Sequence, residues 1–296
     1  MKKFHLPLAM LILAGCLFDP ETPETGSSWT VRNWGNTGNL NLVIWAGSKL
    51  VAVSDAGQII TSPDGVTWTS RGSGATPFSD VTWAGNIIVA VGELGKIFSS
   101  SNGGDGWIER NSMIGGSLSC VAWTGRQLVA VSASLEVITS PNGIDWTWVS
   151  NTPSAPLSLA WTGKILVGVG KNGTILTSPD GITWTARNSG TTKTLRSVIW
   201  TGNQLATIGD SGAFIKSPDG IAWTAGSING SPNLRDVTWA KNKFVAVGAG
   251  DTVYTSPDGI SWTSKLLPGY CQPYSVTWTG SQIVAVGFRG VIVTSP

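Results

Sequence analysis

The stretch TSPDGITWT at residues 177–185 recurs with few changes along the chain. Near copies read TSPDGVTWT at 61–69, KSPDGIAWT at 216–224 and TSPDGISWT at 255–263. In Ser-Pro-Asp-Gly, proline presets φ at the first turn position, aspartate bonds back to the following amides, and glycine adopts the positive φ that ends a short hairpin. The phrase therefore predicts a tight turn between two strands, used several times.

Tryptophans mark the period of this repetition. Fourteen of the sixteen fall into two interleaved series in which every step is 38 to 40 residues. The first series is Trp29, Trp68, Trp107, Trp146, Trp184, Trp223 and Trp262, and the second is Trp45, Trp83, Trp123, Trp161, Trp200, Trp239 and Trp278. Self-similarity at this period is typical of a repeat architecture, and seven units of about 39 residues account for nearly the whole chain.

Each unit contains four short apolar runs separated by turn signals. Around Trp200 the runs are RSVIW, QLATIG, AFIKS and IAWTA, and the turns are TGN, DSG and PDG. Four strands joined by hairpins make one propeller blade. The sequence therefore predicts an all-β fold, a seven-bladed β-propeller of four-stranded antiparallel blades over residues 27–296.

The two ends of the chain favour a closed ring over a β-helix or an open solenoid. The chain stops at Ser295 and Pro296, the first half of an SPDG turn, and residues 26–29 match the second half. We therefore expect the N-terminal strand to join the last blade, whose other strands come from residues 274–294. Closure of this kind pairs two edges that would otherwise be exposed.

The first residues read MKKFHLPLAMLILAGC, with a basic start, an apolar stretch and small residues before Cys16, as in a secretory signal. Residues 13–16 resemble a bacterial lipobox, and this resemblance implies a signal peptide at 1–15, acylation of Cys16 and a tether at 16–26. With Leu17 next to the cysteine, it also favours the outer membrane in a cell that has two. The alternatives are an ordinary signal peptide and an N-terminal helix buried in a membrane.

Charge excludes several classes of function. Without residues 1–15 the chain loses two lysines, which leaves 17 basic residues against 17 acidic ones. A nucleic-acid or polybasic membrane-surface role needs a concentrated positive field, so neither is expected. The only histidine, His5, is lost as well, and with it every histidine-based mechanism or metal site.

One unit is longer than the others and carries a resemblance to a known family. Residues 100–107, SSNGGDGW, resemble the Asp-box of sialidase-like propellers with Asn102 in place of aspartate. Together with the preceding VAVG pattern, the unit is similar to the repeat of BNR and photosystem II assembly-factor-like propellers. The resemblance implies the fold over about residues 27–296 and no single function, because such folds host many unrelated roles.

The repeated box residues are interpreted as structural, since every role of the turn is local. These positions are Asp64, Asn102, Asn142, Asp180, Asp219 and Asp258. Calcium binding is the alternative, but a hard cation wants six or more oxygens and each turn offers few. No metal or cofactor is predicted. Cys120 and Cys271 fall in distant units, so we expect buried thiols and no disulfide between them.

A sialidase would need an F/Y-R-I-P start motif and an arginine cluster, and the sequence lacks that motif. We therefore predict no enzymatic activity. The departures from the repeat point to a binding face at the mouth of the channel, where the loops into the inner strands converge. Its candidate residues are Asn41, Phe78, Asp80, Arg196, Arg235, Asp236, Tyr270 and Tyr274. Such a patch suits a carboxylate, a glycan or an acidic peptide, and the alternative is ordinary solvated loop charge.

Two tryptophans outside the series, Trp34 and Trp148, are either packing residues or surface recognition residues. The resulting hypothesis is a monomeric, lipid-anchored envelope protein that acts as a binding or assembly scaffold for a protein or glycan partner. The alternative is an extracytoplasmic glycan-binding or glycan-cleaving protein. A convergent set of carboxylates in the channel would favour the enzyme, and a broad face built from loops would favour the scaffold.

Overall fold

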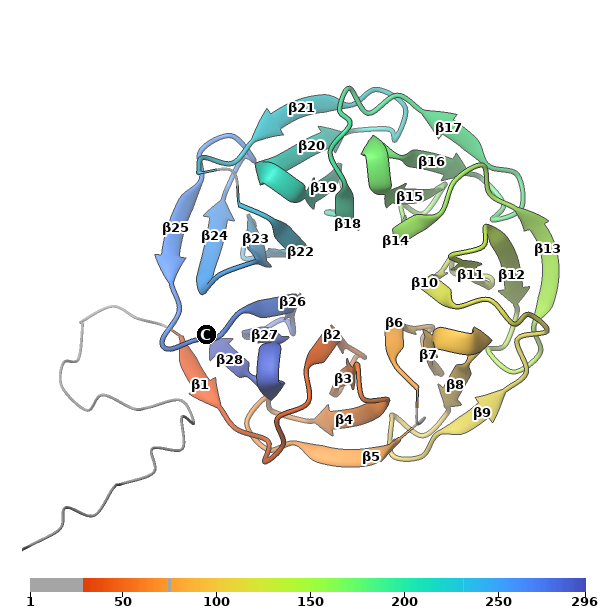
Figure 1. The fold of residues 1–296 in the computed structure, drawn as a ribbon, viewed down its shortest axis with the longest axis horizontal. Coiled ribbons are helices and arrows are strands. Elements are labelled where there is room, and N and C mark those ends of the chain that lie inside the picture. The colour runs from red at the N-terminus through yellow and green to blue at the C-terminus, as the bar shows by residue number, and fades with distance from the viewer. Residues whose placement is uncertain (1–28, 74–75, 231) are drawn as a thin grey trace, which may run out of the picture.

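A computed structural model describes residues 29–73, 76–230 and 232–296. Over these residues seven four-stranded sheets stand around one central axis, as Figure 1 shows. This arrangement confirms the predicted seven-bladed propeller. The proposed signal peptide, Cys16 and the tether lie outside the described residues. Within the described part, the model has no helix with the length and apolar character needed to span a membrane.

Blades 1 to 6 each contain four strands in chain order from the axis outward. Blade 1 has β2 (Leu40–Trp45), β3 (Leu50–Ser54), β4 (Gln58–Ser62) and β5 (Thr69–Ser73); blade 2 has β6 (Phe78–Trp83), β7 (Ile88–Gly92), β8 (Ile97–Ser100) and β9 (Ile108–Arg110). Blade 3 has β10 (Leu118–Trp123), β11 (Leu128–Ser132), β12 (Glu136–Ser140) and β13 (Thr147–Asn151); blade 4 has β14 (Pro156–Trp161), β15 (Leu166–Gly170), β16 (Ile175–Ser178) and β17 (Thr185–Arg187).

Blades 5 and 6 repeat this order. Blade 5 has β18 (Leu195–Trp200), β19 (Leu205–Gly209), β20 (Ala213–Ser217) and β21 (Thr224–Ser227); blade 6 has β22 (Leu234–Ala240), β23 (Lys243–Gly248), β24 (Thr252–Ser256) and β25 (Thr263–Leu266). Short 3-10 turns form the middle hairpin of four blades: η1 (Glu93–Gly95), η2 (Lys171–Gly173), η3 (Asp210–Gly212) and η4 (Phe288–Gly290).

Blade 7 closes the ring with strands from both ends of the chain. It consists of β26 (Pro273–Trp278), β27 (Ile283–Gly287), β28 (Ile292–Ser295) and β1 (Thr30–Arg32). Strand β1 pairs antiparallel with β28, with Thr30 opposite Thr294 and Arg32 opposite Ile292. The predicted closure by the N-terminal strand is therefore confirmed.

The hydrophobic core is divided into seven clusters, one for each pair of neighbouring blades. The cluster between blades 7 and 1, for example, joins Val284 and Val286 to Leu40 and Val43. The second strand of blade 1, β3 (LVAVS), is buried at every position, because each sheet is covered on both faces by its neighbours. The ring is thus held by packing between blades as well as by strand pairing.

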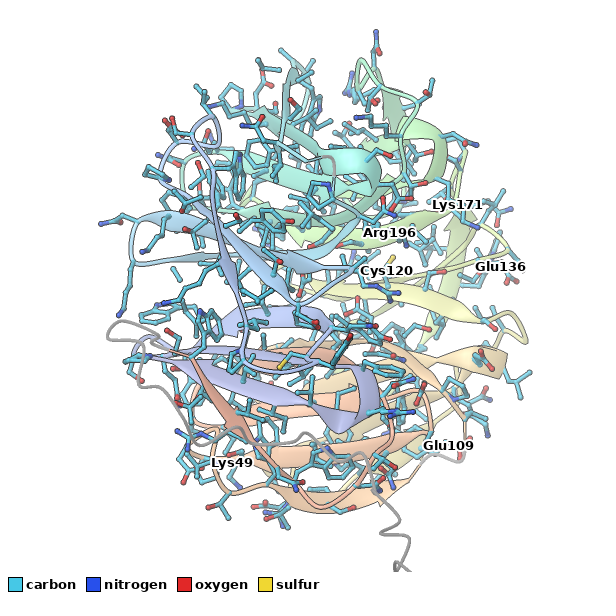
Figure 2. The ribbon with its side chains drawn as sticks, turned by 60° about the vertical axis from the view of Figure 1, so that its left-hand side comes forward. Lys49, Glu109, Cys120, Glu136, Lys171 and Arg196 are labelled. Atoms are coloured by element: carbon cyan, nitrogen blue, oxygen red, sulfur yellow. The ribbon has the colours of Figure 1, made fainter. Side chains whose placement is uncertain are left out.

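The antiparallel order gives the ring two different faces. The mouth face carries the connections that lead into the inner strands and the hairpins between second and third strands. The box face carries the turns between first and second strands and the SPDG turns between third and fourth strands. In the side view of Figure 2, Lys171 of the mouth face and Lys49 of the box face lie on opposite sides of the ring.

Candidate binding face and central channel

The SPDG turns of the box face use their polar side chains locally. In blade 4, one carboxylate oxygen of Asp180 accepts hydrogen bonds from the amides of Ile182 at 2.8 Å and Thr183 at 2.7 Å. The buried hydroxyl of Ser178 donates to the same carboxylate and accepts from the amide of Gly181 at 2.8 Å. These bonds account for the repeated serine and aspartate without a ligand.

The same pattern recurs in other blades. Hydrogen bonds from the amides of Ser261 and Ile260 lower the pKa of the Asp258 carboxyl to about 2. Asn142 takes the same place in blade 3, where its side-chain oxygen accepts from two backbone amides at 2.9 Å. The turn glycine is also required, because Gly181 has φ near +76° and an added Cβ would lie 2.6 Å from Val129 of the preceding blade.

The mouth face owes its variable residues to a bulge at the start of each inner strand. In all seven blades the pairing with the second strand skips the second residue, as between Leu40 and Leu42 in β2. The skipped residues are Asn41, Ser79, Ser119, Leu157, Arg196, Arg235 and Tyr274. A bulge re-aims its side chain away from the regular ladder, which frees this position to differ between blades.

The structure brings some of the predicted face residues together. The guanidinium carbon of Arg235 lies 4.1 Å from the ring centre of Tyr274 in the next blade, a cation–π contact. Arg196 of blade 5 is exposed, but it forms a bidentate ion pair with Asp210 at 2.6 and 3.0 Å. Tyr270, in the connection before blade 7, is 81% exposed. The exposed part of the face therefore centres on Arg235, Tyr270 and Tyr274.

Two other residues that were predicted for the binding face, Phe78 and Asn41, make contacts within the protein. Phe78 is only 1% exposed and packs edge to face on Phe98 at 5.5 Å, so its placement on an exposed face is wrong. It occupies the first position of β6, where four other blades carry a buried leucine. Asn41 donates a hydrogen bond to the backbone carbonyl of Phe78 at 3.1 Å and so joins blades 1 and 2.

The structure also shows where the two tryptophans outside the series and the two cysteines of the propeller lie. Trp34 packs against the cluster between blades 7 and 1, as a packing residue does. Trp148 is half exposed, on the outer strand β13 and away from the channel mouth. The thiols of Cys120 and Cys271 are buried and are not joined to each other, as predicted.

Asp80 and Asp236 lie inside the channel, not on its rim. The inner strands enclose a cavity of about 440 Å³, and both side chains line it. One oxygen of Asp236 accepts from Ser275 at 2.7 Å and Val276 at 2.9 Å in blade 7, and the other accepts from Ser197 of blade 5 at 2.7 Å. Asp80 accepts from the amide of Val121 in blade 3 at 2.8 Å. These bonds join neighbouring blades around the channel.

The channel carboxyls bind protons more tightly than ordinary aspartates. Burial raises the pKa of Asp80 to about 7, with a smaller contribution from the charge of Asp236, and burial also raises the pKa of Asp236. All four carboxylate oxygens already accept hydrogen bonds within the protein. Their geometry therefore fits a structural belt around the channel.

Sequence reasoning missed this belt, although a signal for it is present. The third position of the inner strands is polar or thiol-bearing in six of the seven blades, within otherwise apolar strands: Asp80, Cys120, Ser158, Ser197, Asp236 and Ser275. Across residues 29–73, 76–230 and 232–296, no group of three or more His, Cys, Asp or Glu side chains is placed to hold a metal ion.

The fold and its faces define the chain as a seven-bladed β-propeller with inter-blade hydrogen bonds around its channel. No protein-family model matches the sequence, and no curated protein matches it. Among solved structures, it is similar to YCF48 bound to a D1 peptide, with a TM-score of 0.76 and 18% identity over 92% of this chain and 97% of that one.

Two further structures share the fold. YCF48 from Cyanidioschyzon merolae has a TM-score of 0.69 at 18% identity, over 90% of this chain and 98% of that one. The WD40 propeller domain of Doa1 has a TM-score of 0.72 at 13% identity, over 90% and 95% of the two chains. At these identities the likeness shows the fold alone.

Proposed function

We propose that this protein is a lipid-anchored scaffold of the cell envelope whose mouth face binds a protein partner without turnover. The observation that carries the proposal is the set of bulged positions, which converge around the channel mouth and carry five different residue types over the seven blades. The structure of YCF48 bound to a D1 peptide shows that a propeller of similar fold binds a peptide.

The chemistry of the mouth face favours an acidic or carboxylate-bearing segment of the partner. Arg235 is exposed, stacks on Tyr274 and has no carboxylate partner among the described ion pairs. Its guanidinium is therefore held in place with donors available, an arrangement suited to bidentate recognition of a carboxylate. Tyr270 adds an exposed ring, and aromatic and arginine residues are enriched in binding hot spots.

Backbone strain on the same face supports recognition. Leu94 and Arg289 occupy the middle of the 3-10 hairpins of blades 2 and 7 with φ of 56° and 52°. The same position of the hairpin also has positive φ in blades 4, 5 and 6, where it carries Asn172, Ser211 and Gly250. A bulky residue in this conformation costs free energy, and backbone strain of this kind clusters at binding and active sites.

The anchor is proposed from the sequence alone. Cys16 in its lipobox-like segment, followed by an acidic, proline-bearing tether, would hold the propeller at an envelope membrane, the outer one in a cell with two. Labelled fatty acid should enter the wild-type protein and not the Cys16→Ser variant. Wild-type protein released into the medium with an unmodified N-terminus would contradict the anchor.

Affinity capture from detergent-solubilised envelope tests the binding role. Wild-type protein should retain a partner that the Arg235→Ala, Tyr274→Ala double variant loses. The matched control replaces Arg126 and Lys164, two cations of the box face, with alanine and should retain the partner. Equal capture by the wild-type protein and the mouth-face variant would contradict the proposal.

A glycan-cleaving enzyme is the second candidate, and one observation favours it. Asp80 and Asp236 line the same cavity, and glycosidases act with paired carboxyl groups. Purified protein should then hydrolyse members of a glycoside panel, and Asp80→Asn should abolish the activity. Absence of turnover over the whole panel leaves the scaffold as the better account.

A further inference from the structure

Five exposed aliphatic side chains occupy one repeated position on the box face. They directly follow the turn glycine in blades 1, 3, 4, 5 and 6, and are 43 to 73% exposed: Val66, Ile144, Ile182, Ile221 and Ile260. Because the position is the same in each blade, the side chains stand on one face of the ring. Four of them belong to consecutive blades, so they form an arc.

The turn itself does not require an aliphatic residue there. At Ile182 and Ile260 the contribution to the turn is the backbone amide, which donates to the box aspartate. Blade 2 carries Asp105 at this position, ion-paired with Lys49 at 2.7 Å and Arg71 at 2.9 Å, and keeps a turn of the same kind. The turn therefore does not require isoleucine or valine in the other five blades, and apolar surface exposed together on one face marks an interaction site.

The N-terminal end of the described chain lies on this same face. Strand β1 takes the outer position in blade 7, and outer strands start where the box turns end, so Trp29 enters from the box face. Blade 7 stands between blade 6, with Ile260, and blade 1, with Val66. The twelve residues between Cys16 and Trp29 span at most about 43 Å. An acylated Cys16 would thus hold the box face within reach of a bilayer.

The charges of this face fit an uncharged surface better than an anionic one. The described turns of the box face carry six carboxylates and four cations: Asp64, Asp105, Asp145, Asp180, Asp219 and Asp258, and Lys49, Arg126, Lys164 and Lys241. Arg71, Lys216 and Lys243 reach the same face from adjoining strands, so the face has no marked excess of either charge. Trp83 is also partly exposed there, at the box-face end of β6, and tryptophan favours the membrane interface. We therefore expect apolar side chains, and not charges, to provide the attraction between this face and a lipid surface.

We propose that the box face lies on the lipid bilayer, with the aliphatic arc inserted at the boundary between headgroups and acyl chains and the mouth face turned to solvent. This inference rests on the proposed lipid anchor, which supplies the nearness to the membrane. The partner chemistry is a zwitterionic lipid surface. Shallow burial of apolar side chains is the general mode of such interfacial contacts.

Site-specific fluorescence on vesicles tests the orientation. Full-length Ile182→Cys and Ile260→Cys proteins, labelled with an environment-sensitive dye, are reconstituted into phosphatidylcholine vesicles that contain a nitroxide-labelled lipid. Leu94→Cys and Met113→Cys on the mouth face, 66 and 68% exposed, are the matched controls. Cys120 and Cys271 are fully buried and should stay unlabelled in the folded protein.

We expect quenching of the box-face dyes to be several-fold stronger than that of the mouth-face dyes, and insensitive to salt. Changing Ile182, Ile221 and Ile260 together to serine should remove most of the difference for a dye at Ile144→Cys. Equal quenching at the two faces would overturn the proposal. So would salt-sensitive quenching, or box-face dyes shielded by self-association of the protein without lipid.

A second attachment separates this inference from the anchor. The Cys16→Ser full chain, with a hexahistidine tag ahead of Met1, is held on vesicles by a nickel-chelating lipid. Box-face quenching in this protein, together with failure of fatty acid to label the wild type, would contradict the lipid anchor and support the contact of the box face with the bilayer. Equal quenching at both faces in acylated wild-type protein would contradict the contact of the box face with the bilayer and support the lipid anchor.

Discussion

The two faces of the propeller are built from turns of the same seven blades, yet they treat their side chains differently. On the box face, buried serines such as Ser178 and exposed aspartates such as Asp180 are bonded to their own turn. On the mouth face, bulged residues such as Arg235 and Tyr274 touch each other across blades and remain partly open to solvent. Among the polar side chains, the repeated ones therefore serve the fold and the variable ones are free for recognition, whereas the repeated aliphatic residues of the box face are not required by their turns.

The largest expected effect is the loss of both faces when the ring is opened. Deleting residues 29–33 removes β1 and Trp29, which packs in the cluster between blades 6 and 7. Even Trp29→Ala alone should lower the free energy of unfolding by about 3–5 kcal/mol, as large-to-small core changes do. Thermal unfolding checks this, with deletion of residues 17–25 as the control. Equal melting temperatures for the two deletions would refute the role of closure.

A serine-to-alanine pair sharpens the contrast between the faces. Ser178→Ala leaves the buried amide of Gly181 without its acceptor and should cost about 1–3 kcal/mol. Ser79→Ala removes the same hydroxyl from an exposed bulge of the mouth face, and such surface changes stay within about 0.5 kcal/mol. Chemical denaturation measures both. A comparable loss in the two variants would show that the faces do not differ in this way.

The channel between the faces should make stability depend on pH. Because the pKa of Asp80 is about 7 in the folded protein, above its ordinary 3.8, the folded state binds the proton more tightly. This contribution is complete below about pH 4 and is lost as pH rises through about 7. The free energy of unfolding should therefore fall between about pH 4 and about pH 7.

The slope of the free energy of unfolding against pH, and not its absolute value, shows whether Asp80 is the group that titrates. Asp80→Asn should show a shallower fall over the same range, with a residual slope from Asp236, whose pKa is raised in the same direction. The box aspartates have lowered pKa values, so their contribution is lost only at more acidic pH. An unchanged slope in Asp80→Asn would contradict this assignment.

The smallest effect on stability is expected at the mouth face. Changing Arg196 and Arg235 together to alanine removes one exposed ion pair and one stacking contact, and should shift the free energy of unfolding by no more than about 1 kcal/mol. Capture of the proposed partner should nevertheless be lost. A large loss of stability would show that these arginines support the fold. Normal capture of the partner would show that they are not part of the binding surface.

The sequence predicted best what depends on local turn chemistry. The SPDG phrase and the tryptophan spacing were enough for the blades, their number and the closure by residues before Arg32. Placement of single side chains was less accurate, because it depends on register. The bulge shifts the pattern by one residue, so Asp80 lies in the channel and Phe78 in the core, although both were expected at the mouth.

Contacts between blades were beyond reach of the sequence. Arg196 of β18 meets Asp210 in η3 of its own blade, but Asp236 bonds to residues 39 positions away on both sides. Such pairs become neighbours only when the ring is assembled. The alignment of units did hold a usable signal, since Phe78 aligns with Leu40, Leu118, Leu195 and Leu234, which are all buried.

The shared bulge also has a consequence for the entropy of binding. Recognition residues on long loops must be ordered when a partner arrives, and each immobilised side chain or loop reduces the affinity. Here the seven variable residues stand on inner strands that are already paired on one side and packed against their neighbours. Their backbones lose little freedom on association. A propeller of this design can therefore change its specificity by exchanging single residues, without building a new loop and without giving up a rigid binding surface.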